Sequence, residues 1–214
     1  MTASILPDPE QASSLRERKH LRSRRRILEE ATRLFEAAGY SQTTLKDIAE
    51  AAETSIPTVM RYFGSKDTIF LYRHTRIVEE LASRLDSAAY PSLDAALRDA
   101  METSLEDLSE RERLLDIIRR DPEYEALTAK MRRDWESLLE RVILAFSPST
   151  RTGRMRAKSL AYMLAASGMA GLEFWYEEGK GDAPGASQRH LIDEFMATFI
   201  TPIDQAYVAR RNAG

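Results

Sequence analysis

Apolar residues recur along the chain at spacings of three and four residues, which is the pattern of amphipathic helices. Ser23 is placed to cap the start of one such helix, and Gly39 is placed to end it. The apolar positions of this helix are Ile27, Leu28, Ala31, Leu34, Phe35 and Ala38. No stretch shows the alternation of apolar and polar residues that is typical of a strand. The pattern therefore predicts an all-α protein.

Two short helices are predicted directly after this long one. Thr44 is followed three residues later by Asp47, which is a capping-box pattern. Ser55 is a good N-cap for the next helix, and Pro57 lies in its first turn, where a missing N–H is harmless. Gly64 permits the left-handed turn that ends this helix. A long helix followed by two short ones is the pattern of a helix-turn-helix, whose last helix must fit the major groove of DNA.

The rest of the chain is also predicted to be helical, because Pro and Gly punctuate long periodic stretches. The expected helices lie near residues 66–88, 92–109, 112–120, 123–146, 154–178 and 188–210, the last kinked before Pro202. The expected domains are a basic, disordered arm at residues 1–21, a helix-turn-helix domain at 22–66 and a larger helical domain at 67–214.

Charge is distributed unevenly along a chain that is nearly neutral overall. The 214 residues include 31 Lys and Arg against 34 Asp and Glu, which is a formal net charge of −3. A basic run precedes the helix-turn-helix, and Glu17 is the acid within it. Its basic members are Arg16, Arg18, Lys19, Arg22, Arg24, Arg25 and Arg26. Such a run is either a solvated surface or an arm that binds DNA phosphates.

The composition argues against an enzyme or a metalloprotein. The chain has no Cys, and its 3 His residues are far apart in sequence, so no metal, cofactor or catalytic set is expected. The acidic residues of the second half alternate with Arg, as in a solvated ion-pair surface. The N-terminus lacks the pattern of a signal peptide, and the weakly charged stretch from Ser159 to Leu172 is shorter than the roughly 20 residues of a membrane span. A cytoplasmic protein without membrane contact is expected.

Several short motifs of the first third coincide with those of a known family. They are Arg26-Ile27-Leu28, Leu34-Phe35, Gly39-Tyr40, Thr43-Thr44, Ile48-Ala49, Ser55, Thr58, Arg61-Tyr62-Phe63 and Ser65-Lys66. Together they closely resemble the N-terminal domain of TetR-family transcriptional regulators, over Arg22 to Leu71. The resemblance implies an all-α fold with an N-terminal three-helix helix-turn-helix domain and a larger helical domain for ligand binding and dimerisation.

The resemblance also implies that residues 56–62 form the recognition helix. Thr44, Tyr62 and Lys66 are expected to contact phosphates, which position a protein on DNA without reading sequence. The alternative to a phosphate contact for Tyr62 is internal packing beside Phe63. The full predicted DNA-binding set is Arg25, Thr44, Ile56, Pro57, Thr58, Met60, Arg61, Tyr62 and Lys66.

Base edges are expected to meet Thr58, Met60 and Arg61. A guanidinium pairs bidentately with guanine, so Arg61 is the expected reader of a guanine, with a solvated surface as the alternative. The sequence departs from the family pattern at Glu53, in place of the usual turn Gly, and at Pro57, where Gly is frequent. It departs again at Met60, which replaces a common Tyr and suits a thymine methyl. Glu53 is expected to face away from DNA or to tolerate strain.

For the C-terminal domain the resemblance implies dimerisation through the last two long helices and an internal effector site. The predicted dimer residues are Ala161, Ala165, Gly168, Gly171, Phe195 and Phe199. The predicted effector pocket is Met101, Leu105, Ile117, Met131, Trp135, Tyr162 and Met163. Ordinary core packing is the alternative for both sets, since small and apolar residues also fill cores.

The predicted function is that of a repressor that binds a palindromic operator as a homodimer and is released by a small effector. Leu15 to Lys19 and Leu114 to Pro122 resemble a TetR subgroup related to mycofactocin-system regulators, which implies an apolar or acyl-CoA-like effector. The alternative is an architectural or protein-recruiting DNA-binding factor without a small effector.

Overall fold

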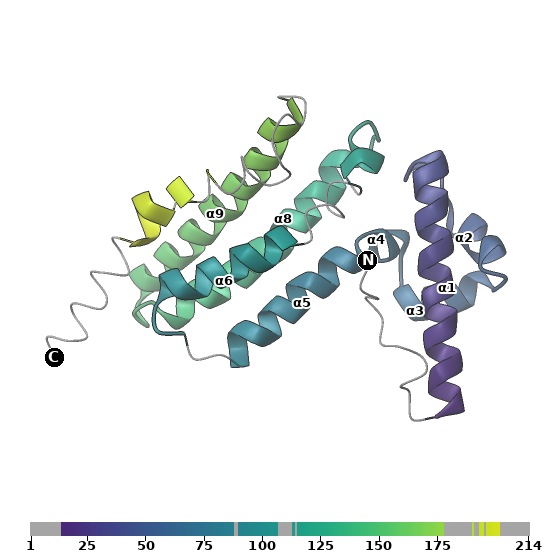
Figure 1. Cartoon of the computed structure of the whole chain (residues 1–214), viewed down its shortest axis with the longest axis horizontal. Helices are drawn as coiled ribbons and strands as arrows, with labels where there is room; N and C mark the ends of the chain where they lie inside the picture. Colours follow the sequence, from purple (N-terminus) through teal and green to yellow (C-terminus); the bar gives the residue numbers. More distant parts are fainter. Residues whose placement is uncertain are drawn as a thin grey trace, which may run out of the picture. The chain divides into compact units, whose positions relative to one another are not determined.

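The computed structural model describes residues 14–87, 90–106, 113, 115–177, 190, 193–194 and 196–201, which are helical with short connections and contain no strand. The elements are α1 (Leu15–Ala38), α2 (Leu45–Ala51), α3 (Ile56–Phe63), α4 (Lys66–Phe70), α5 (Tyr72–Ser87), α6 (Leu93–Glu106), α8 (Tyr124–Ala145), α9 (Arg151–Glu177) and the π-helical turn η2 (Met196–Ile200) (Figure 1). The predicted all-α class is confirmed. In this described part, each helix is too short or too polar to cross a membrane.

The chain divides into two compact units. The first comprises Met1–Arg76 and Arg113–Thr128, and the second comprises Ile77–Glu112 and Ala129–Gly214. This division differs from the expected boundary after residue 66. Phe70 of α4 packs edge to face against Phe35 and Tyr40, which ties α4 to α1. Ile118, on a helical turn far along the chain, is also buried.

Helix α1 begins well before the predicted start at Ser23. Ser14 caps it, because the Ser14 hydroxyl accepts a hydrogen bond from the Glu17 N–H at 3.2 Å. Glu17 lies in the first turn, where a negative charge favours the positive end of the helix dipole. The prediction of a disordered arm is therefore wrong for residues 15–21, which are helical; residues 1–13 lie outside the described residues.

The two short helices form as their caps predict. Thr44 and Asp47 make a complete capping box at the start of α2. The Ser55 hydroxyl accepts from the Thr58 N–H at the start of α3, and Pro57 stands in the first turn. Gly64 ends α3 with φ 77°, a conformation that L side chains rarely adopt.

The single helix expected near residues 66–88 is two helices. Leu71 separates α4 from α5, and the Leu71 N–H closes the last turn of α4 on the Asp67 carbonyl. The Leu71 side chain is fully buried. Burial of this side chain thus coincides with the break in the helix.

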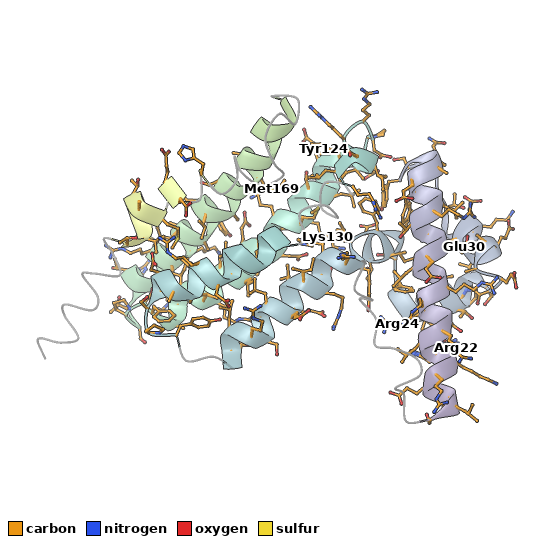
Figure 2. All side chains as sticks on the ribbon, in the orientation of Figure 1. Arg22, Arg24, Glu30, Tyr124, Lys130 and Met169 are labelled. Atoms are coloured by element: carbon orange, nitrogen blue, oxygen red, sulfur yellow. The ribbon has the colours of Figure 1, made fainter. Side chains whose placement is uncertain are left out.

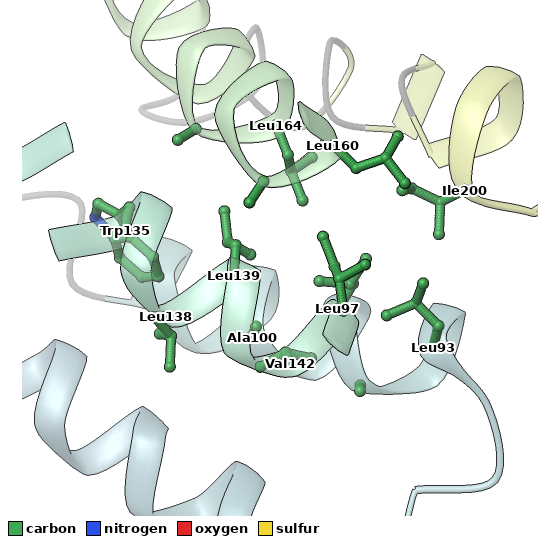
Figure 3. Close-up of a cluster of buried hydrophobic side chains, with 14 of the residues drawn as sticks. Leu93, Leu97, Ala100, Trp135, Leu138, Leu139, Val142, Leu160, Leu164 and Ile200 are labelled. Carbon is green, nitrogen blue, oxygen red and sulfur yellow. The ribbon is translucent and has the colours of Figure 1, made fainter. Parts of the chain in front are cut away.

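The second unit has its own apolar core, formed by α6, α8, α9 and η2 together with Leu81 of α5. Figure 3 shows leucines of α6, α8 and α9 pointing toward one another, with Ile200 of η2 beside them. Helices α6, α8 and α9 agree within three residues with the predicted ranges. Most of the expected helix near residues 188–210 lies outside the described residues.

Candidate nucleic-acid interface

Helix α3 presents one face to its own unit and one to solvent. Val59 and Phe63 are buried and fix the helix against its neighbours. On the opposite side Ile56 is 41% exposed and Met60 is 43% exposed, which is unusual for large apolar side chains. Arg61 is exposed beside them, as is Pro57. This face offers apolar groups and one guanidinium, a combination that suits thymine methyls and guanine edges.

Tyr62 and Thr58 lie at the edges of this face and are half-buried. The Arg61 guanidinium lies 5.2 Å from the centroid of the Tyr62 ring. His20 of α1 meets the same ring edge to face. The Thr58 hydroxyl lies 3.0 Å from the Ser55 hydroxyl, so it has a hydrogen-bond partner at the cap. The α1 residue His20 is a neighbour of the recognition helix that sequence reasoning missed, since the contact spans two helices far apart in sequence.

The basic run lies on the first turns of α1, which include Arg22 and Arg24 (Figure 2). Arg24 makes its contacts within the protein. Its guanidinium lies 5.4 Å from the ring centroids of both Phe63 and Tyr72. It also donates a hydrogen bond to the Tyr72 hydroxyl at 3.3 Å. The run is therefore not a uniform set of free charges.

Other members of the run differ in exposure. Arg26 pairs with Glu53 at 2.5 Å, and Arg25 is half-buried. Arg16 and Lys19 are exposed, and no ion pair joins either of them to another described residue. These two charges are the ones best placed to meet DNA phosphates.

Glu53 occupies the turn between α2 and α3 with φ 49°. A left-handed conformation is strained in a residue with a Cβ, which explains why Gly is usual here. The ion pair with Arg26 neutralises the Glu53 carboxylate, although the Glu53 side chain is 75% exposed. Strain at this position was one of the two expected outcomes.

Lys66 points into its own unit. Its ammonium donates to the carbonyl oxygens of Tyr40 at 2.9 Å and Thr43 at 3.0 Å, and lies 4.1 Å from the centroid of the Tyr40 ring. Two of its three N–H groups are thus used inside the protein. One N–H group of Lys66 remains for the expected phosphate contact. The other two hold the loop between α1 and α2.

Tyr40 and Asp67 belong to the same polar cluster. The Tyr40 hydroxyl donates to the Asp67 carboxylate at 2.8 Å. Burial, and then the hydrogen bond to Asp67, raise the pKa of Tyr40 well above its ordinary value. Tyr40 therefore stays protonated and remains a donor throughout the physiological range.

Thr44 is exposed at the start of α2, and its hydroxyl donates to the Asp47 carboxylate at 2.7 Å. The hydrogen bonds from the Thr44 side chain and backbone lower the pKa of Asp47. A phosphate that approached Thr44 would compete with this carboxylate for the hydroxyl proton.

The described members of the predicted effector set differ in burial. Met131 and Trp135 are buried, but Tyr162 and Met163 are more than 40% exposed on the outer side of α9. The assignment of these last two to an interior pocket is wrong, because α9 turns Leu160 and Leu164 inward instead. Ile117 is half-buried in the first unit. The side chains of Met101 and Leu105 lie outside the described residues.

The predicted dimer residues on α9 differ in burial within their own chain. Ala161 and Ala165 are buried in the core of their own chain, so a partner could cover almost nothing more of them. Gly171 is also buried, whereas a Cβ on Gly168 would have no heavy atom within 4 Å. Phe195 and the Phe199 side chain lie outside the described residues.

Among the described residues, no group of three His, Asp or Glu is arranged to hold a metal ion. A different acid has a structural role that sequence reasoning missed. Asp121 accepts hydrogen bonds from Ser41, 80 residues away in the chain. From the sequence, residues 121 and 122 are only the gap between the helices expected near 112–120 and 123–146.

The sequence is similar to known regulators. Residues 27–72 match the profile of the family described as bacterial regulatory proteins, tetR family. The HTH-type transcriptional repressor AcnR of Corynebacterium efficiens is 30% identical over 145 residues, which cover 64% of this chain and 71% of AcnR. MftR of Mycobacterium tuberculosis, named as a mycofactocin biosynthesis transcriptional regulator, is 25% identical over 164 residues, or 71% of this chain and 79% of MftR.

A solved structure shares the fold over most of the chain. SmeT of Stenotrophomonas maltophilia, in its complex with triclosan, aligns with a TM-score of 0.58 at 21% identity. The alignment covers 82% of this chain and 90% of SmeT. The helix-turn-helix and the helical C-terminal part therefore follow an architecture already seen in solved structures.

Proposed function

This chain belongs to the TetR family of DNA-binding transcriptional regulators, and we propose that it is a repressor that leaves its operator when a small effector binds. The observation that carries the proposal is the exposed face of α3, where Ile56, Met60 and Arg61 project while Val59 and Phe63 anchor the helix. A regulator of this kind acts in the cytoplasm, where its operator lies.

The contacts of the side chains indicate which residues read bases and which bind phosphates. Arg61 pairs with a guanine, and Met60 with Ile56 meets thymine methyls, so these three residues read sequence. Arg16 and Lys19 bind phosphates beside the recognition helix and add affinity that depends on salt. Because Arg24 and Arg26 have partners within the protein, they contribute less to that salt dependence.

A homodimer is the second part of the proposal, since a two-fold operator is matched by a two-fold protein. The supporting observation is a row of large exposed side chains on α9. Met155, Tyr162 and Met163 are seven and eight residues apart, so they share one face of the helix. Large exposed apolar side chains on one face mark an interaction surface.

The effector is proposed to bind in the second unit and to be apolar or acyl-CoA-like. Triclosan, bound to SmeT, is a small apolar compound, and the similarity to MftR agrees with the subgroup resemblance. Met131 and Trp135, both buried on α8, are candidate pocket residues, together with Met101 and Leu105, whose side chains lie outside the described residues.

Selection of bound fragments from the encoding genome, followed by gel shifts on the selected duplex, tests the DNA function. We expect a palindromic operator, and Arg61→Ala should weaken binding by about 1–3 kcal/mol mainly at one base pair. Arg33→Ala, on an exposed part of α1, is the matched control. Equal losses on operator and random duplexes for Arg61→Ala would contradict its role in base reading.

Release by an effector is tested by titrating the operator complex with acyl-CoA thioesters of increasing chain length and with triclosan. Dissociation at a defined ligand concentration supports the repressor. The alternative, an architectural factor without an effector, gains support if operator binding persists through the whole series.

A further inference from the structure

The unit that carries the DNA-binding helices is completed by a segment from much later in the chain. Residues 113–128 belong to the first unit, and Leu115, Ile118 and Leu127 are buried there. Arg113 lies 3.6 Å from Glu36 of α1, although both side chains are about half exposed and the pair is weak. At both ends this segment continues into residues of the second unit.

Asp121 is the polar anchor of this segment. Its Oδ2 accepts a hydrogen bond from the Ser41 N–H at 2.7 Å, and its Oδ1 accepts one from the Ser41 hydroxyl. Oδ1 also accepts from the Glu123 N–H at 3.0 Å. Burial acts to raise the pKa of Asp121, but these hydrogen bonds and the nearby charge of Lys66 outweigh it, so the pKa is lowered. The charged carboxylate is thus the stable form in this place.

The loop that Asp121 holds leads directly into the DNA-binding helices. It begins at Gly39, which has φ 85°, and ends at Thr44, the N-cap of α2. Lys66 holds the same loop through the carbonyls of Tyr40 and Thr43. Asp121, from the segment at residues 113–128, holds the loop at Ser41. The position of α2, and of α3 packed on it, therefore depends on a carboxylate outside the helix-turn-helix.

We propose that Asp121 is a positioning residue for the DNA interface, which acts by fixing Ser41 and with it the loop that leads into α2. The inference rests on the proposed DNA-binding function and adds to it a residue outside the helix-turn-helix. Without the Asp121 carboxylate the loop loses its contact at Ser41, while the contacts of Lys66 with the carbonyls of Tyr40 and Thr43 remain.

The first test compares operator affinity of Asp121→Ala, Ser41→Ala and the double variant with the wild type. The control is Glu125→Ala, which removes the same charge from an exposed residue of the same segment. Loss of the charged acceptor of the part-buried Ser41 N–H should weaken operator binding about tenfold in Asp121→Ala, against less than about twofold in Glu125→Ala. The double variant should be no weaker than Asp121→Ala, because both changes break the same contact.

The second test measures the coupling between operator binding and residues 115–128, and not stability alone. Hydrogen exchange of residues 115–128 should slow when the selected operator duplex is added to the wild type, and this protection should be absent in Asp121→Ala. Measurements are made at a temperature where circular dichroism shows every variant folded. If Asp121→Ala does not fold, Asp121→Asn, which keeps one acceptor, takes its place with a smaller effect expected.

Two results would overturn the inference: operator affinity of the Asp121 variant within twofold of the control, or protection of residues 115–128 that survives in the variant. Failure of the wild type to select any operator would instead contradict the proposed function. The two failures are distinguishable because the wild type is measured first in each experiment.

Discussion

The His20 imidazole of α1 meets the Tyr62 ring of α3 edge to face, with 4.6 Å between the ring centroids. This contact joins the first turns of α1 to the end of the recognition helix. An aromatic pair of this kind contributes about 0.5–1.5 kcal/mol beyond its burial. The basic turn before His20 is thereby held beside α3.

His20→Ala should weaken operator binding by about two- to tenfold, because Arg16 and Lys19 lose their fixed position relative to α3. Fluorescence anisotropy with a labelled operator measures the change. His190→Ala, an exposed position in the second unit, is the control and should leave the affinity unaltered. Equal affinities for the two variants would mean that the His20 contact is not used on DNA.

Lys66→Ala should lower the free energy of unfolding by about 1–3 kcal/mol, because the carbonyls of Tyr40 and Thr43 lose their donor. Lys66→Arg should not restore it, since a planar guanidinium does not match the two carbonyls as a compact ammonium does. Urea denaturation measures both. Lys46→Ala, which removes an exposed pair with Glu50, is the control and should change stability by less than about 0.5 kcal/mol.

Glu53→Gly should stabilise the protein by roughly 1–2 kcal/mol, because Gly adopts the left-handed turn without strain. It should also make operator binding more dependent on salt, since Arg26 is released from its ion pair to meet phosphates. Thermal denaturation and binding at several salt concentrations are the measurements. Glu50→Gln controls for loss of a nearby charge, and an unchanged salt dependence in Glu53→Gly would show that Arg26 stays away from DNA.

Met163→Glu should convert the proposed dimer to monomers, because it places a charge on the exposed apolar face of α9. Light scattering with size-exclusion chromatography reports the mass. Ser137→Glu, at an exposed position of α8, adds the same charge and should leave the dimer intact. A dimeric Met163→Glu would assign the interface to another face.

Acid should lower the stability of the first unit, in part because it protonates the Asp121 carboxylate. The pKa of Asp121 is lowered in the folded state from an ordinary value of 3.8, so its stabilisation is complete above that value and is lost as the pH falls through the folded pKa. Lys66 is a charged neighbour that lowers the pKa of this carboxyl, and Tyr40 also interacts with it electrostatically. As the pH falls below about 4, the free energy of unfolding of Asp121→Asn should therefore decline less than that of the wild type. If the stability of the wild type and that of Asp121→Asn declined in parallel with pH, the contribution of Asp121 to acid sensitivity would be contradicted.

The sequence by itself determined the elements whose signals are local. Thr44 with Asp47, and Ser55 with Thr58, satisfy the free N–H groups of α2 and α3 within a few residues, so their caps could be read directly. Helix α3 followed from the same local pattern, and its role as recognition helix is a prediction from the family resemblance. The start of α1 was misjudged because Ser14 and Ser23 are both plausible caps, and contacts of His20 and Arg24 with distant rings accompany the longer helix.

Only the tertiary structure decided which way side chains point and which distant residues meet. Small residues of α9 predicted close helix packing, but the periodicity could not tell whether Ala161 packs against its own chain or a partner. The sequence predicts a phosphate contact for Lys66, and only the structure shows that its ammonium also donates to the carbonyls of Tyr40 and Thr43. Asp121 and Ser41 meet across 80 residues, and a hydrogen bond of that range leaves no periodic trace, because it depends on how the helices pack and not on local spacing.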